Sequence, residues 1–174
     1  LWNSLPDIFA SAANYLSRSG WKKDRTWGRE IRLPSSFDMG LSGLETRKSL
    51  AEWNTLGVRQ VNGKPLPDVA VDDASVLLPA GYRGPAFLIY KNYRTTMVWN
   101  RSHLYALAVG HLSDRLVGKG KLRADLGDAN PLTRRDIFDL QRRLNALGFN
   151  AGTPDGRTGP MTRKAIKGYQ RKHG

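Results

Sequence analysis

The sequence has 174 residues, enough for one full domain or for one domain and a small second unit. Hydrophobic residues make up 40% and charged residues 25%, as in folded globular proteins, and no apolar run approaches the ~20 residues that a membrane-spanning helix needs. The absence of cysteine excludes disulfides and thiolate metal sites. The net charge of +13 favours an anionic partner, such as nucleic acid, a membrane surface or a carboxylate-bearing cell wall, but also fits a solvated basic surface.

The amino-terminal residues predict a helix followed by a strand. A helix is expected over 1–16, because Ser4 can cap its start and Gly20 can terminate it. Residues 30–33 alternate between charged and apolar side chains, a pattern that is typical of a strand at the edge of a sheet.

The middle of the chain predicts a small β-rich patch between helices. A helix is expected over about 46–56, with Thr46 or Ser49 as its cap. Two short strands are expected at 76–78 and 86–90, because both runs are apolar and turn-forming prolines and glycines separate them.

The remaining sequence predicts a long helix, a linker and a small helical unit. An amphipathic helix capped by Ser102 is expected to end the first domain, which spans 1–117. Residues 118–131 combine glycine with charge and have no apolar period, so we expect a linker there. Residues 132–174 show helical apolar spacing on both sides of a glycine-rich loop. The expected fold class is therefore α+β and mostly helical.

The end of the chain carries a recognisable series of short motifs. Leu140-Gln141, Leu147-Gly148-Phe149, Asp155-Gly156 and Gly159-Pro160 follow one another in an order that resembles the peptidoglycan-binding repeat attached to many cell-wall hydrolases. The resemblance implies a small, three-helix-type peptidoglycan-binding domain over 132–174, in truncated form. Binding is expected from the loop residues Asp155, Gly156, Arg157, Thr158 and Gly159.

Three upstream segments belong together. They read LWNSLPDIFASAANYLSRSGW, KSLAEWNTLGV and LLPAGYRGPAFLIYKNYRTTMVWNRSHLYALAVGHL, and together they resemble the membrane-bound lytic murein transglycosylase B family. The resemblance implies the carboxyl-terminal part of a lysozyme-like domain with a small β-rich patch. Enzymes of this family cleave the bond between N-acetylmuramic acid (MurNAc) and N-acetylglucosamine (GlcNAc) without water, and they leave a 1,6-anhydro sugar.

The resemblance places the catalytic glutamate of the family upstream of Leu1, so no catalytic residue is expected in this chain. Gly43-Leu44-Glu45-Thr46 repeats part of the catalytic motif. However, Arg47 and Lys48 follow it, and their charges would lower the pKa of Glu45, whereas a general acid for glycosidic cleavage needs a raised pKa. We therefore expect the chain alone to be inactive.

The same resemblance implies a set of glycan-contacting residues. Aromatic faces pack on sugar rings, and asparagine amides bind hydroxyl and acetamido groups. The expected substrate-binding residues are Tyr15, Asn92, Tyr93, Trp99 and Asn100. The alternative for each aromatic residue is a place in the hydrophobic core. No cofactor or metal is expected, because Asp7, which matches an outlying calcium ligand of some relatives, is a single carboxylate and calcium takes six to eight oxygens.

The expected partners are peptidoglycan glycan strands and other cell-wall enzymes. This expectation implies a periplasmic location, at the outer membrane or the cell wall. The alternative is a nucleic-acid-binding protein, since residues 118–174 hold 13 of the 28 basic residues and only five of the 15 acidic ones. No known nucleic-acid motif accompanies these charges, so peptidoglycan is the favoured partner.

Overall fold

The computed structural model describes residues 4–81, 84–123 and 132–173. The chain divides into two compact units, Leu1–Gly127 and Asp128–Gly174, here called unit 1 and unit 2. Each unit has a hydrophobic core of its own. The domain limits at 117 and 132 remain predictions, and residues 124–131 of the expected linker lie outside the described residues.

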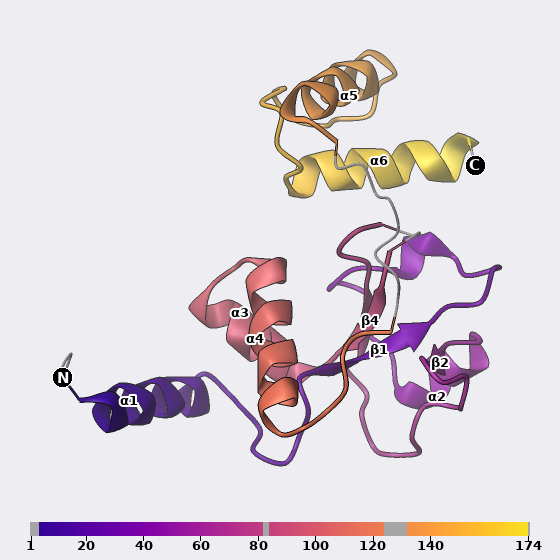
Figure 1. The fold of residues 1–174 in the computed structure, drawn as a ribbon. Helices are drawn as coiled ribbons and strands as arrows, with labels where there is room; N and C mark the ends of the chain where they lie inside the picture. Colours follow the sequence, from indigo (N-terminus) through magenta and orange to yellow (C-terminus); the bar gives the residue numbers. More distant parts are fainter. Residues whose placement is uncertain (1–3, 82–83, 124–131, 174) are drawn as a thin grey trace. The chain divides into compact units, whose positions relative to one another are not determined.

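Unit 1 combines helices with a small antiparallel sheet (Figure 1). Its elements are α1 (Leu5–Arg18), β1 (Gly28–Arg32), the 3₁₀ helix η1 (Met39–Leu41), α2 (Leu50–Thr55), β2 (Arg59–Gln60), β3 (Ser75–Leu77), β4 (Ala86–Ile89), α3 (Lys91–Trp99) and α4 (His103–Leu116). The strands lie in the order β2-β1-β4-β3.

Strand β4 is buried on both faces, and this explains its continuous apolar sequence. Because side chains alternate along a strand, Phe87 and Ile89 face one way and pack in a cluster that includes Tyr93 of α3. Ala86 and Leu88 belong to the second cluster, which includes residues of α2. Figure 1 shows α3 and α4 on one side of the sheet and α2 on the other.

Helix α4 approaches the start of β1 very closely at a glycine. A Cβ atom on Gly110 would lie 2.4 Å from a ring carbon of Trp27, which is closer than any side chain allows. The indole Nε1 of Trp27 donates a hydrogen bond of 3.0 Å to Asp114, one turn further along α4. Residue 110 therefore has to be glycine for the ring and the helix to pack in this way.

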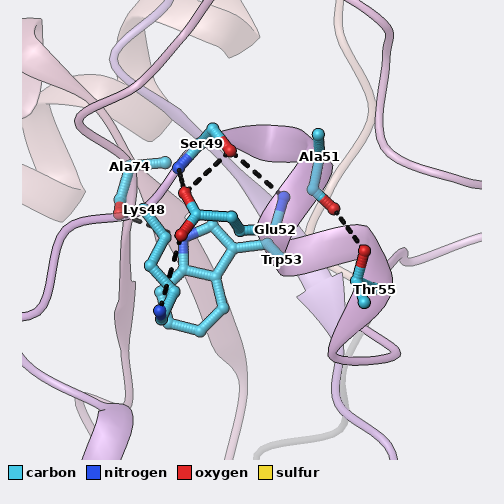
Figure 2. A network of polar contacts seen from close by, with 7 residues as sticks. All are labelled: Lys48, Ser49, Ala51, Glu52, Trp53, Thr55 and Ala74. Carbon is cyan, nitrogen blue, oxygen red and sulfur yellow. Dashed lines mark hydrogen bonds and ion pairs between the residues drawn. The ribbon is translucent and has the colours of Figure 1, made fainter.

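Helix α2 begins with a capping box (Figure 2). The hydroxyl of Ser49 accepts from the backbone N–H of Glu52 at 3.1 Å, and the carboxylate of Glu52 accepts from the backbone N–H of Ser49 at 2.8 Å. Hydrogen bonds from Ser49 hold the pKa of Glu52 below its ordinary value. Below this cap, the wholly buried Trp53 donates to the carbonyl of Ala74 at 3.0 Å. Of the two predicted caps, the structure uses Ser49.

The structure of unit 1 differs from the sequence-based expectation at β1 and at α3, among other elements. The strand predicted at the sheet edge, β1, is an inner strand, because the two-residue β2 pairs with its outer side. Helix α3 was not expected from the sequence, since β-branched residues such as Thr95 and Thr96 disfavour a helix. Both threonines are buried and donate their hydroxyl hydrogens to backbone carbonyls of the preceding turn.

Unit 2 is built on two helices, α5 (Arg134–Ala146) and α6 (Pro160–His173). Within residues 132–173 these are the helices of the unit, where the resemblance implied a three-helix type. Thr133 and Asp136 form a capping box at the start of α5. The small core is formed by Leu144, Ala151 and Ala165.

Gln141 holds unit 2 together through its side-chain amide. Only 2% of the residue is exposed. Its Oε1 accepts from the backbone N–H groups of Asp155 and Gly156, each at 2.9 Å. Its Nε2 lies 3.0 Å from the carboxylate of Asp155 and 3.0 Å from the hydroxyl of Thr162. One side chain of α5 thus fixes both the loop after residue 154 and the first turn of α6.

We predict that Gln141→Leu destabilises unit 2 by about 2–4 kcal/mol, because several buried polar groups lose their partner together. The exposed Gln170 of α6 provides the matched control, and Gln170→Leu should change stability by less than ~0.5 kcal/mol. Urea unfolding followed by NMR signals of unit 2 measures the effect. All five tryptophans lie at or before Trp99, so tryptophan fluorescence should report an unchanged unit 1. Equal losses in the two variants would contradict the prediction.

Candidate functional site

An exposed aromatic pair lies where α1 contacts α3. Tyr15 of α1 and Trp99, the last residue of α3, meet edge to face with ring centroids 5.0 Å apart. Tyr15 is 43% exposed and Trp99 is 50% exposed. Each ring is therefore held in place by the other while part of its surface stays open. Such a pair is suited to packing against the apolar face of a sugar ring.

Asn100 follows Trp99 directly and is also exposed. Its side-chain oxygen accepts from the backbone N–H of Ser102 at 3.0 Å, and Ser102 in turn caps α4. The side chain is thereby fixed at the start of α4, directly after Trp99 in the sequence. Three of the five predicted substrate-binding residues, Tyr15, Trp99 and Asn100, thus belong to one exposed region at the end of α3.

The other two predicted residues, Asn92 and Tyr93, are fully buried. The amide of Asn92 accepts from the backbone N–H of Lys22 at 2.8 Å and donates to the carbonyls of Lys22 and Arg25 at 2.8 and 2.6 Å. Asn92 therefore ties α3 to the segment that follows α1. The hydroxyl of Tyr93 lies 2.9 Å from Nδ1 of His103, and burial raises the pKa of this hydroxyl. In this structure both side chains position other segments, and their contact with glycan stays a prediction.

The chain has three glutamates, all within the described residues, and none lies in a buried apolar site. Glu45 is exposed and lines a surface cavity of about 360 Å³ together with Arg47 and Arg94. Glu30 accepts a hydrogen bond from the backbone N–H of Arg123, and Glu52 takes part in the cap of α2. A general acid for glycosidic cleavage needs burial that raises its pKa, so these positions do not suit that role.

Metal-binding clusters and membrane-spanning helices are both absent from the described residues. Among them, no three His, Asp or Glu side chains lie together in an arrangement that could hold a metal ion. Asp7 lies exposed in the first turn of α1, near the positive end of the helix dipole. No helix within residues 4–81, 84–123 and 132–173 is long and apolar enough to cross a membrane.

In unit 2, the predicted loop residues divide into two that shape the loop and others that face solvent. The carboxylate of Asp155 accepts from Gln141 and from the backbone N–H of Arg157, and these bonds lower its pKa. Gly156 is buried at a φ of 72°, and a Cβ there would lie 2.5 Å from Arg134. Arg157 and Thr158 are exposed, and Gly159 is half-buried. Direct binding by all five residues remains a prediction.

A cavity of about 500 Å³ opens beside this loop. It is lined by Arg134, Arg135, Phe138, Pro154, Asp155 and Gly156. Phe138 is 40% exposed on α5, and Arg134 and Arg135 precede it by about one helical turn. Sequence reasoning missed these three residues because they precede the loop by a full helix. The one available signal was an aromatic residue on the otherwise polar face of α5.

Two family models match the sequence. The model described as Transglycosylase SLT domain matches residues 1–114, and a peptidoglycan binding domain model matches residues 133–174. A comparison with curated proteins gave no match.

Solved structures are similar to both parts of the chain. SltB3 from Pseudomonas aeruginosa, in complex with NAG-anhNAM-pentapeptide, is 47% identical with a TM-score of 0.90, over 97% of this chain and 46% of SltB3. Its complex with NAG-NAM-pentapeptide gives 48% identity and a TM-score of 0.88. The Escherichia coli lytic transglycosylase Slt35, in complex with bulgecin A, is 25% identical with a TM-score of 0.50, over 64% of this chain and 34% of Slt35. The chain thus spans less than half the length of these relatives.

These comparisons confirm the expected fold class and both resemblances. The described helices and the four-stranded antiparallel sheet form the α+β, mostly helical arrangement that the sequence predicted. The first family model covers more than half of the chain. The chain therefore belongs to the transglycosylase SLT domain family, and a peptidoglycan-binding domain follows its SLT part.

Proposed function

We propose that the chain is part of a peptidoglycan lytic transglycosylase, in which it supplies a glycan-contacting surface and a peptidoglycan-binding module. The reaction is the non-hydrolytic cleavage of the MurNAc–GlcNAc bond, with 1,6-anhydroMurNAc as the product. The proposal is carried by the 47% identity, over 97% of this chain, to SltB3, which was solved in complex with NAG-anhNAM-pentapeptide. The nucleic-acid alternative has no support from the comparisons.

The exposed region at the end of α3 supports the glycan-contacting role. Tyr15 and Trp99 offer open ring surface that is already fixed by their mutual contact, so little conformational entropy is lost on binding. The amide of Asn100 lies next to Trp99 in the sequence and can bind sugar hydroxyl or acetamido groups. Asn92 and Tyr93 support this region indirectly, because their buried side chains fix neighbouring segments through hydrogen bonds.

The cavity beside the loop supports a separate binding role for unit 2. Phe138 provides an aromatic surface for a sugar, and Arg134 and Arg135 provide positive charge for carboxylates of the wall. Arg157 extends the positive charge across the loop. An aromatic ring combined with cations suits a polymer that carries both sugars and acidic peptides.

The proposed substrate sets the proposed location and partners. Peptidoglycan glycan strands are the binding partner, and other cell-wall enzymes are further partners. The chain accordingly works in the periplasm, at the outer membrane or the cell wall. The mechanism needs no cofactor or metal, because one carboxyl group acts first as acid and then as base.

We predict that the purified 174-residue chain releases no anhydro-muropeptides from peptidoglycan sacculi. None of its three glutamates is buried, whereas a general acid for glycosidic cleavage needs burial in an apolar site. Mass spectrometry of the soluble products measures the outcome, with an active lytic transglycosylase as the positive control. Release by this chain that disappears in Glu45→Gln would make Glu45 the catalytic acid and contradict the prediction.

We predict that Tyr15→Ala and Trp99→Ala each weaken binding of neutral GlcNAc oligomers roughly two- to tenfold, because one aromatic packing surface is removed. Val98→Ala is the matched control, since Val98 is 58% exposed on the same helix. Calorimetry measures affinity, and thermal unfolding checks that the fold is kept. Equal affinity of the three variants would remove the aromatic pair from the proposed site.

For unit 2 we predict that Phe138→Ala and Arg157→Ala release the chain from sacculi at ~1 M salt, where the Debye length is only ~3 Å. The chain should also carry Tyr15→Ala and Trp99→Ala, so that the aromatic pair of unit 1 does not contribute to retention. Arg171→Ala is the matched control, because it removes an exposed charge from α6 instead. Release of every version at this salt would indicate unspecific attraction, and tighter binding of duplex DNA at equal ionic strength would support the nucleic-acid alternative.

A further inference from the structure

Arg94, on α3, carries a positive charge that the protein only partly satisfies. Its Nη2 donates to the hydroxyl of Ser75 at 2.6 Å. Its Nε and Nη1 are shielded from water and have no hydrogen-bond partner among the described residues. A buried charged donor without an acceptor is costly, so an acceptor brought by a ligand would stabilise this arrangement.

The surroundings of Arg94 add to its positive charge. The cavity of about 360 Å³ is lined by Leu44, Glu45, Arg47, Arg94, Met97, Val98 and Arg101. Three guanidinium groups therefore face one carboxylate. Burial, and after it the charge of Arg47, lowers the pKa of Arg94, while Asp73 and Glu45 act in the opposite direction. The cavity is thus an electropositive site with apolar walls.

We infer that this cavity binds a carboxylate of the peptide stem that peptidoglycan carries on its glycan strand. Arginine is the side chain that best matches a carboxylate, because its planar N–H groups can bind both oxygens. Met97, Val98 and Leu44 provide apolar contact for small side chains of the peptide. The inference rests on the proposed function and assigns the peptide part of the same substrate to a second place in unit 1.

The geometry of α3 allows one ligand to reach both the aromatic pair at Trp99 and the cavity at Arg94. Arg94 and Trp99 are five positions apart, so they point about 140° away from each other around the helix. A helix with its side chains is ~10–12 Å wide, and an extended pentapeptide spans ~17 Å. A sugar packed on Trp99 can therefore carry a peptide that reaches the cavity. Arg101 lines the cavity and follows Asn100 directly, which shortens the path.

The test compares two ligands, NAG-anhNAM-pentapeptide and the same disaccharide without its peptide, by calorimetry on the whole chain. The wild-type chain should bind the first at least about tenfold more tightly, as expected for hydrogen bonds to a charged group. In the Arg47→Ala/Arg101→Ala double variant this ratio should fall towards one, and added salt should reduce it in the wild type. Arg32→Ala, which removes an exposed charge from β1, should leave the ratio unchanged.

The outcomes separate the inference from the proposed function. If the disaccharide binds and is sensitive to Trp99→Ala, but the peptide adds no affinity, the inference is overturned and the glycan site remains. If neither ligand binds, both fail. A ratio that falls equally in Arg32→Ala would also overturn the inference, because general attraction would then explain the preference.

Arg94→Gln separates ligand binding from a structural role. Because the variant removes a buried charge that lacks acceptors, its Tm should equal or exceed that of the wild type, while the preference for the peptide-bearing ligand is lost. A lower Tm with an unchanged ligand preference would show that Arg94 serves the fold alone.

Discussion

The burial of β4 on both faces is the constraint on which the rest of unit 1 depends. Its alternating residues are shared by two hydrophobic clusters, so the strand can neither shift nor rotate without exposing apolar surface. Helix α3 begins at Lys91, directly after this strand, and Tyr90 is its cap residue. The rotation of α3 about its axis is therefore set by the sheet. That rotation decides which of its side chains face the core, α1 or the surface cavity.

Asn92 and Arg94 show two different outcomes for polar groups on the same helix. Every hydrogen bond of the Asn92 amide connects α3 to the segment after α1, and the side chain is fully buried without an unpaired group. Arg94 keeps two nitrogens without acceptors. Folding alone favours the first arrangement and penalises the second. The contrast supports a ligand as the missing partner of Arg94, because only one of its guanidinium nitrogens, Nη2, has an acceptor among the described residues.

Some elements could be predicted from short sequence patterns such as helix caps, and others could not. Ser49 was one of the two expected caps of α2, and it forms a capping box with Glu52, as Thr133 does with Asp136 at the start of α5. The short strand β2 and helix α3 could not be predicted, because neither sequence carries a clear apolar period. Pairing with β1 and packing in the folded unit decide their form instead. For the site, a motif indicates which residue types recur but not which way they face. Asn92 and Asn100 therefore looked equivalent in the sequence, although one is buried and the other exposed.

The modest strength of each proposed contact agrees with a polymeric substrate. An exposed aromatic pair contributes only about 1 kcal/mol per ring, and surface arginines lose much of their attraction in salt. A glycan polymer, however, offers the same sugars and peptide carboxylates repeatedly. Once one unit of the chain is bound, the other samples nearby repeats at a high effective concentration, so two weak sites together give strong retention. Weak individual contacts also let the chain leave each repeat quickly, because a low affinity corresponds mostly to fast dissociation.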